Sequence, residues 1–295
     1  MTVNWNGKLG ACVAATLLLG FGGAARAQSP SSGQSGQAQP APQPTDKDKN
    51  KAPATEALTL DTPAPVNAEE DAAFKAFQDV ALTDAPKKIQ SGEAFAAKYP
   101  ESRYRPIVYS TLVSEYLTTG DLDKMQVIGE KEIALKPDDA QTLAILGQTL
   151  SRLAARTHDA TERSTMVGKS IKYSKQAIET VPTLPKPANL TDESFTSAKN
   201  VVLATAHSGL GLAYLMEGKA NDAASELDQA VKVDPTPDPV NYYLLGMADE
   251  KGSHFEDAIA AFNKCAAAPG GMQASCKNGA EEAKKLSQTQ LSAPK

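Results

Sequence analysis

The chain has 295 residues, of which 22% are charged and 41% are hydrophobic, and its formal net charge at pH 7 is −5. Removal of the first 27 residues, which include Lys8 and Arg26 but no acidic residue, leaves 28 basic residues against 35 acidic ones, a net charge of −7. This balance excludes binding to nucleic acid or to an anionic membrane surface through charge, because both need a cluster of basic residues.

The first 27 residues have the order of a secretory signal peptide. Lys8 gives a positive start, residues 11–21 are apolar, and Ala25-Arg26-Ala27 forms a small-residue cleavage site. The apolar run is too short for the roughly 20 residues that span a bilayer, so we expect no transmembrane segment after cleavage. A lipid anchor on Cys12 is disfavoured because most of the apolar run follows this cysteine. We therefore expect an exported protein, either periplasmic or secreted.

Residues 28–65 consist mainly of Ser, Gln, Pro, Ala and Lys, with a mixed-charge run at residues 46–51. Such a segment cannot bury enough apolar surface to offset the entropy lost on ordering. We expect a disordered linker here, and a helical domain over residues 66–290.

A repeated helical pattern is clearest between Ala206 and Pro235. Its landmarks are His207, Leu210-Gly211, Tyr214, Gly218, Ala223, Leu227, Ala230 and Pro235. The small residues let two helices approach closely, the second glycine ends the first helix, and the proline ends the second helix. This pattern resembles the tetratricopeptide repeat (TPR). The resemblance implies an all-α fold in which helical hairpins stack into a solenoid, a right-handed superhelix.

Three further copies follow the same phase. They begin at Pro106, near Ala140 and near Pro239. The second helix of the middle copy is delayed by extra sequence at residues 157–165. In the last copy Asp249 occupies a position that normally holds an aromatic residue, so its first helix is predicted to pack loosely or end early.

Shorter amphipathic segments stand at the two ends of the domain. Residues 73–81 and 89–99 predict a degenerate opening hairpin, and residues 273–286 predict a polar-faced helix that caps the stack. The short sequence at residues 98–102 is similar to the junctions between repeats in bacterial TPR proteins that take part in envelope assembly. Thr191 is predicted to start a helix after the loop at residues 183–189.

No motif points to catalysis or to a cofactor. Gly168-Lys169-Ser170 imitates part of a phosphate-binding loop, but Arg163 occupies the place of the opening glycine. His158, His207 and His254 are far apart and lack ligand spacing, so no metal is expected. An enzyme with its site at residues 157–165 or 183–189 is the least favoured alternative, because these stretches hold no convergent acid and base groups.

The TPR resemblance implies a scaffold that binds a segment of another polypeptide in a concave groove. A structural subunit of an envelope-assembly or secretion complex is the alternative. The oligomeric state and the partner stay open at this point.

The expected groove residues are the first-helix positions that point away from the second helix of each hairpin. They are Ser110, Ser114, Leu117, Ala144, Gln148, Arg152, Ser208, Leu212, Leu215, Tyr243 and Met247. This surface is neutral and partly apolar, and it lacks the lysine and asparagine set with which some family members clamp a carboxylate. The apolar residues from Leu212 to Met247 suit an amphipathic helix or an extended peptide, or else they pack against the cap or a loop.

The two cysteines of the mature chain are predicted to form a disulfide. Cys265 lies near the end of the last second helix, Cys276 lies near the start of the cap, and the turn at residues 269–271 is midway between them. Antiparallel helices joined by such a turn bring the two positions opposite each other. The alternative is a pair of small buried residues.

Overall fold

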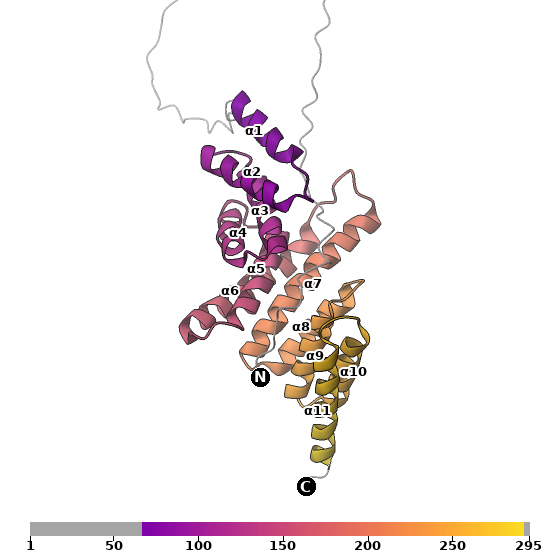
Figure 1. Cartoon of the computed structure of the whole chain (residues 1–295). Helices are drawn as coiled ribbons and strands as arrows, with labels where there is room; N and C mark the ends of the chain where they lie inside the picture. The colour runs from indigo at the N-terminus through magenta and orange to yellow at the C-terminus, as the bar shows by residue number, and fades with distance from the viewer. Residues whose placement is uncertain (1–66, 292–295) are drawn as a thin grey trace, which may run out of the picture.

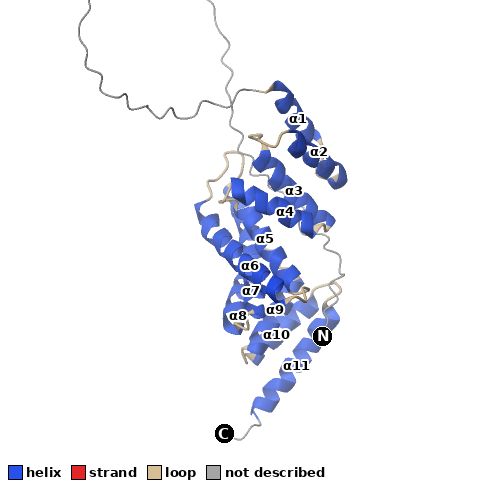
Figure 2. Ribbon diagram, turned by 90° about the vertical axis from the view of Figure 1, so that its left-hand side faces the viewer, coloured by secondary structure: helices blue, strands red, loops and turns tan. Residues whose placement is uncertain are grey.

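The computed structural model describes residues 67–291, and these form eleven α-helices and one short 3₁₀ helix without a β-strand (Figures 1 and 2). The expected signal peptide and linker, residues 1–65, lie outside the described residues. The α-helices are α1 (Ala68–Asp79), α2 (Ala85–Lys98), α3 (Arg105–Thr119), α4 (Leu122–Leu135), α5 (Ala140–Ala154), α6 (Ala160–Thr180), α7 (Asp192–Met216), α8 (Ala220–Val233), α9 (Pro239–Lys251), α10 (Phe255–Ala267) and α11 (Gln273–Leu291).

Consecutive helices pack as hairpins, and the hairpins stack along the chain from α1 at one end to α11 at the other (Figure 1). The first helices of the repeats are α3, α5, α7 and α9, and the second helices are α4, α6, α8 and α10. Helix α11 packs on α10 and closes the C-terminal end. The predicted all-α hairpin solenoid is therefore confirmed.

Short polar side chains define where most helices begin. The side chain of Thr191 accepts a hydrogen bond from the backbone N–H of Ser194, as predicted for the start of α7. Aspartates cap α2, α4, α5, α6 and α9 in the same way. Gly120 and Gly218 follow α3 and α7 with φ of 78° and 76°, a left-handed conformation that glycine adopts without a steric penalty.

The pairs of small and large residues bring the helices of each hairpin together. A Cβ atom added to Gly211 would lie 2.5 Å from the side chain of Leu227, and one on Gly246 would lie 2.8 Å from the ring of Phe262. The glycines on the first helices thus make room for bulky residues of the second helices. This is the packing predicted from the repeat pattern.

An aromatic cluster holds the opening hairpin on the stack. Phe74 of α1 lies against Tyr104, with 3.9 Å between ring centroids, and the Tyr104 hydroxyl donates a hydrogen bond to Asp71 over 2.8 Å. Phe77 and Phe95 are buried in the same cluster, which continues into α5. The predicted opening hairpin therefore belongs to the same core as the first full repeats.

Four helices differ from the prediction. Helices α6 and α7 contain 21 and 25 residues, whereas the others before the cap contain 12 to 15. The extra sequence at residues 157–165 largely becomes the first turns of α6, capped by Asp159. Helix α9 does not end early at Asp249: it continues to Lys251 with Asp249 only 7% exposed. The cap α11 extends to Leu291, five residues beyond its predicted end.

Candidate functional site

The first helices α5, α7 and α9 approach one another closely, and we call the surface of α3, α5, α7 and α9 the first-helix face. A Cβ on Gly209 of α7 would lie 2.7 Å from the backbone nitrogen of Gln148 on α5. Between α7 and α9, the Ser208 hydroxyl donates a hydrogen bond to the side-chain oxygen of Asn241 over 2.6 Å. Backbone contact and a buried hydrogen bond therefore fix the spacing of α5, α7 and α9.

The structure places the predicted groove residues at different depths. Ser114, Ser208 and Leu212 are buried, with exposures of 6%, 2% and 7%, and so is Ala144 at 1%. The prediction that these four residues are accessible in a groove is therefore wrong, and Ser208 and Leu212 are covered by Asn241 and Leu244 of α9. The partly exposed members are Ser110, Leu117, Gln148, Arg152, Leu215, Tyr243 and Met247.

The predicted apolar patch toward the C-terminal repeats is mainly packing surface. Leu212 lies in a core cluster with Leu244, against which Leu215 and Met247 also pack. Tyr243 lies 5.6 Å from Phe262, measured between ring centroids, in a cluster that includes Ala283 of α11. The cap and the last hairpin thus take up most of the apolar surface from Leu212 to Met247.

Two apolar residues that sequence reasoning missed are more accessible on the same helix faces. Ile107 is 36% exposed and lies one turn before Ser110 on α3, and Val201 is 43% exposed and lies two turns before Ser208 on α7. The length of α7 is what adds Val201 to the face. The signal that could have found it is the uninterrupted helical sequence after Thr191, which contains neither glycine nor proline before Gly209.

Arg152, the basic residue among the predicted groove residues, lies near an acidic side chain. Burial lowers the pKa of the Arg152 guanidinium, and the carboxylate of Asp238 acts in the opposite direction. Arg152 therefore lies in a partly buried environment with a nearby acid. It is not a freely exposed cation for an acidic ligand.

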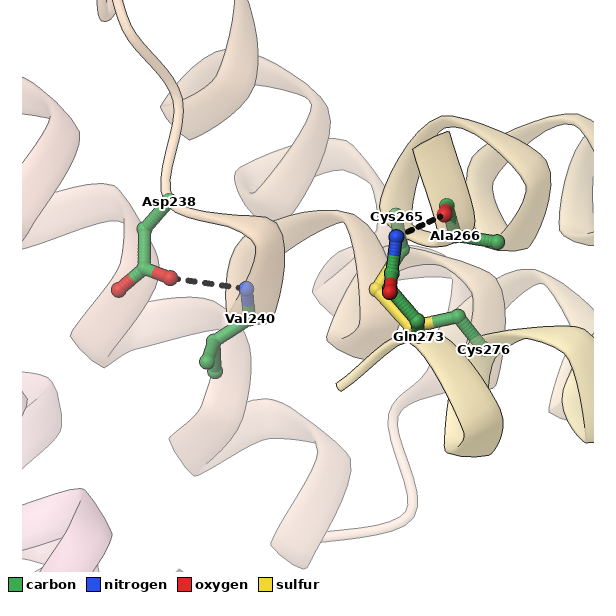
Figure 3. Close-up of a disulfide and its surroundings, with 6 residues drawn as sticks. All are labelled: Asp238, Val240, Cys265, Ala266, Gln273 and Cys276. Carbon is green, nitrogen blue, oxygen red and sulfur yellow. Dashed lines mark hydrogen bonds between the residues drawn. A yellow bond between two sulfur atoms is a disulfide. The ribbon is translucent and has the colours of Figure 1, made fainter. Parts of the chain in front are cut away.

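The predicted pair Cys265 and Cys276 is joined as a disulfide, with 5.8 Å between the two Cα atoms (Figure 3). Both cysteines are fully buried, and the Gln273 side chain donates a hydrogen bond to the backbone oxygen of Ala266 beside them. The bond links α10 to α11. It therefore fastens the cap to the last repeat.

Several residues that were weighed as phosphate-binding or metal-binding candidates form contacts within the fold. Lys169 pairs with Glu130 over 2.7 Å, and the Ser170 hydroxyl donates to the backbone oxygen of Gly147. The Nδ1 atom of His207 lies 2.6 Å from Glu226. Residues 67–291 contain no group of three or more His, Cys, Asp or Glu side chains arranged to hold a metal ion. Within this range no helix is long and apolar enough to cross a membrane.

Charged side chains inside the stack were not predicted from the sequence. Lys88 is buried, and its Nζ atom donates to the backbone oxygens of Phe77 and Val80 at the end of α1. Glu132 is fully buried, and neither of its carboxylate oxygens has a hydrogen-bond partner. Burial raises the pKa of Asp249 to about 6, to which the carboxylate of Asp257 contributes.

The stacked hairpins of this chain form the all-α solenoid that the resemblance to the tetratricopeptide repeat implied. No protein-family model and no curated protein matches the chain. Among solved structures, it is similar to TTC0263, a thermophilic TPR protein in Thermus thermophilus, with 18% identity, a TM-score of 0.46 and coverage of 74% of this chain and 100% of that one.

A second similar structure is the "MamA RS-1 ArsTM double mutant", with 14% identity and a TM-score of 0.48 over 68% of this chain and 93% of that chain. Sequence identities this low carry no argument about partners.

Proposed function

We propose that this TPR solenoid is an exported scaffold that holds a segment of another polypeptide on its first-helix face. The observation that supports this most strongly is the character of that face within residues 67–291. It combines hydroxyl, amide and aliphatic side chains, and its exposed apolar residues include Ile107 and Val201. Stacked hairpins present such an extended surface without any reactive group.

The ligand favoured by this face is neutral or apolar. Leu117 and Leu215 offer partly exposed aliphatic surface, and Gln148 offers an amide that can pair with a peptide backbone. The partly buried Arg152 with Asp238 nearby gives little compensation to a strongly acidic ligand. An amphipathic helix or an extended peptide with aliphatic anchors therefore fits better than an acidic tail.

The location we propose is the periplasm or the cell exterior. The signal-like order of residues 1–27 supports export, and the disulfide between Cys265 and Cys276 suits an oxidising compartment. Within the envelope, transient binding of a partner is the primary proposal. Permanent membership of an assembly or secretion complex would show itself as a stoichiometric complex that survives purification.

A pair of matched substitutions tests the role of the first-helix face. Val201→Asp places a charge on this face, and Val127→Asp places the same charge on the second helix α4, where Val127 is 55% exposed. Proteins that associate with the tagged wild-type chain in its native cells are identified by affinity purification. The proposal predicts that their recovery is lost with Val201→Asp and kept with Val127→Asp, with both variants as stable as the wild type. Equal recovery with Val201→Asp would place the binding surface elsewhere.

A further inference from the structure

One glutamate occupies a position that holds a small, uncharged residue in two of the other hairpins. Gly120, Gly218 and Ser253 end first helices with positive φ values of 78°, 76° and 64°. Twelve residues after each of them lies a fully buried residue of the second helix, and these residues are Glu132, Ala230 and Cys265. The hairpin of α3 and α4 therefore carries a carboxyl group in a position built for a small side chain.

Glu132 lies at the packed junction between α4 and α5. Its exposure is 0%, and neither Oε atom has a hydrogen-bond partner, although the hydroxyl of Thr142 on α5 is near enough to favour the charged form. A buried ionised carboxylate without partners is costly, whereas the protonated form is tolerated far better. Full burial and missing partners are therefore the geometric basis for a proton-dependent junction.

The neighbouring charges do not remove this cost. In the turn between α4 and α5, Asp138 and Asp139 act against ionisation of Glu132, and Lys136 favours it. Lys136 is shared, since its Nζ atom lies 3.3 Å from the carboxylate of Asp139. Burial is the largest cause, and together these groups raise the pKa of Glu132 to about 8.

Charged side chains on the other helices around α4 interact with groups other than Glu132. On α3, Arg105 pairs with Glu101, and the Glu115 carboxyl interacts with Lys88 of α2. On α6, Lys169 pairs with Glu130. Tyr173 is buried on the same helix, and its pKa is raised mainly by burial, so the phenol stays neutral. Arg105, Glu115 and Lys169 thus have other partners.

We propose that Glu132 makes the packing of α4 against α5 proton-dependent. Loss of its proton opens this junction and changes the orientation of the hairpins α1–α2 and α3–α4 relative to the helices from α5 onward. Hairpins of a solenoid contact mainly their neighbours, and one junction can therefore open while the others stay closed. The closed form keeps the proton, and the opened form lets the carboxylate reach water.

The direction of the pH effect follows from linkage. The pKa of Glu132 is about 8 in the closed form, and the ordinary value of 4.5 applies when the junction is open. Opening therefore releases a proton between these values, and the opening equilibrium constant rises about tenfold for each pH unit in that range and levels off above it. From pH 6 to pH 8 the expected increase is about 50-fold.

Amide hydrogen exchange of the full chain, read by mass spectrometry and corrected for the intrinsic pH dependence of exchange, tests the proposal. The amides of residues 122–154 should lose about 50-fold in protection between pH 6 and pH 8. Glu132→Gln keeps the shape of the side chain and should abolish this loss. Glu132→Ala, which restores the residue type found at Ala230, should abolish it as well and provides a second variant that folds.

The amides of α8 are the internal control and should keep their protection over the same pH range. Constant protection of residues 122–154 in the wild type would overturn the proposal. So would an equal loss in Glu132→Gln, or an equal loss in α8, because the latter would show unfolding of the whole stack instead of one junction.

Discussion

The close approach of α5 and α7 predicts opposite effects for two glycine-to-alanine substitutions. A Cβ on Gly209 would lie 2.7 Å and 2.8 Å from the backbone nitrogen and Cα of Gln148, and 2.9 Å from the backbone carbon of Gly147. Backbone atoms cannot move aside as a flexible side chain can. Gly209→Ala must therefore push the two first helices apart.

The size of the effect comes from two opposing contributions. Overpacking costs typically about 1–3 kcal/mol, and contact with three backbone atoms places Gly209→Ala at the upper end of this range. The higher helix propensity of alanine compared with glycine raises the free energy of unfolding by about 1 kcal/mol. The expected net loss in the free energy of unfolding is about 2 kcal/mol, and for a domain of this size it lowers the melting temperature by roughly 4–8 °C.

Gly168→Ala is the matched control. Gly168 lies in α6, and an added Cβ would meet no atom within 4 Å. Only the gain in helix propensity remains, and we expect stabilisation of about 0.5–1 kcal/mol. Urea unfolding followed by circular dichroism measures both variants. If Gly209→Ala proved as stable as Gly168→Ala, the close contact between α5 and α7 would be refuted.

Three further predictions concern the cap, a buried acid and the N-terminus. Replacement of Cys265 and Cys276 by alanine should lower the free energy of unfolding by about 3 kcal/mol, the value expected for a short closed loop, and unchanged urea unfolding would contradict this. The pKa of Asp249 is raised to about 6 from 3.8, so its destabilising effect is small near pH 4 and complete above pH 6. The stability advantage of Asp249→Asn over the wild type should therefore grow by about 2 kcal/mol from pH 4 to pH 7 in urea titrations, and a constant difference would refute the assignment. Intact mass of the exported protein should show a chain that begins at Gln28, and a mass that retains residues 1–27 would disprove cleavage.

Much of the fold could be predicted because the repeat pattern is local. The Leu-Gly pairs at residues 210–211 and 245–246 identify first helices by the space they leave, and the structure fills that space with Leu227 and Phe262. The disulfide was predictable for the same reason, since a turn midway between Cys265 and Cys276 fixes their opposition.

The depth of the first-helix face was less predictable because it depends on contacts between repeats. Ser208 and Leu212 occupy positions that point away from the second helix of their hairpin. Helix α9 packs against α7, and its residues Asn241 and Leu244 cover them. Asp249 was expected to weaken α9, yet the helix continues because its backbone bonds are kept while the carboxyl is buried. Spacing within one hairpin does not reveal how far neighbouring hairpins overlap.

Site-specific photo-crosslinking in the native cell tests the central claim most directly. A crosslinking amino acid is placed at Gln148 and Leu215 on the first-helix face, and at the exposed positions Val127 and Asn263 on second helices. The account predicts that a partner polypeptide is captured from Gln148 and Leu215 and not from the two second-helix positions. Capture from Val127 and Asn263 alone would contradict the assignment of the first-helix face as the binding surface.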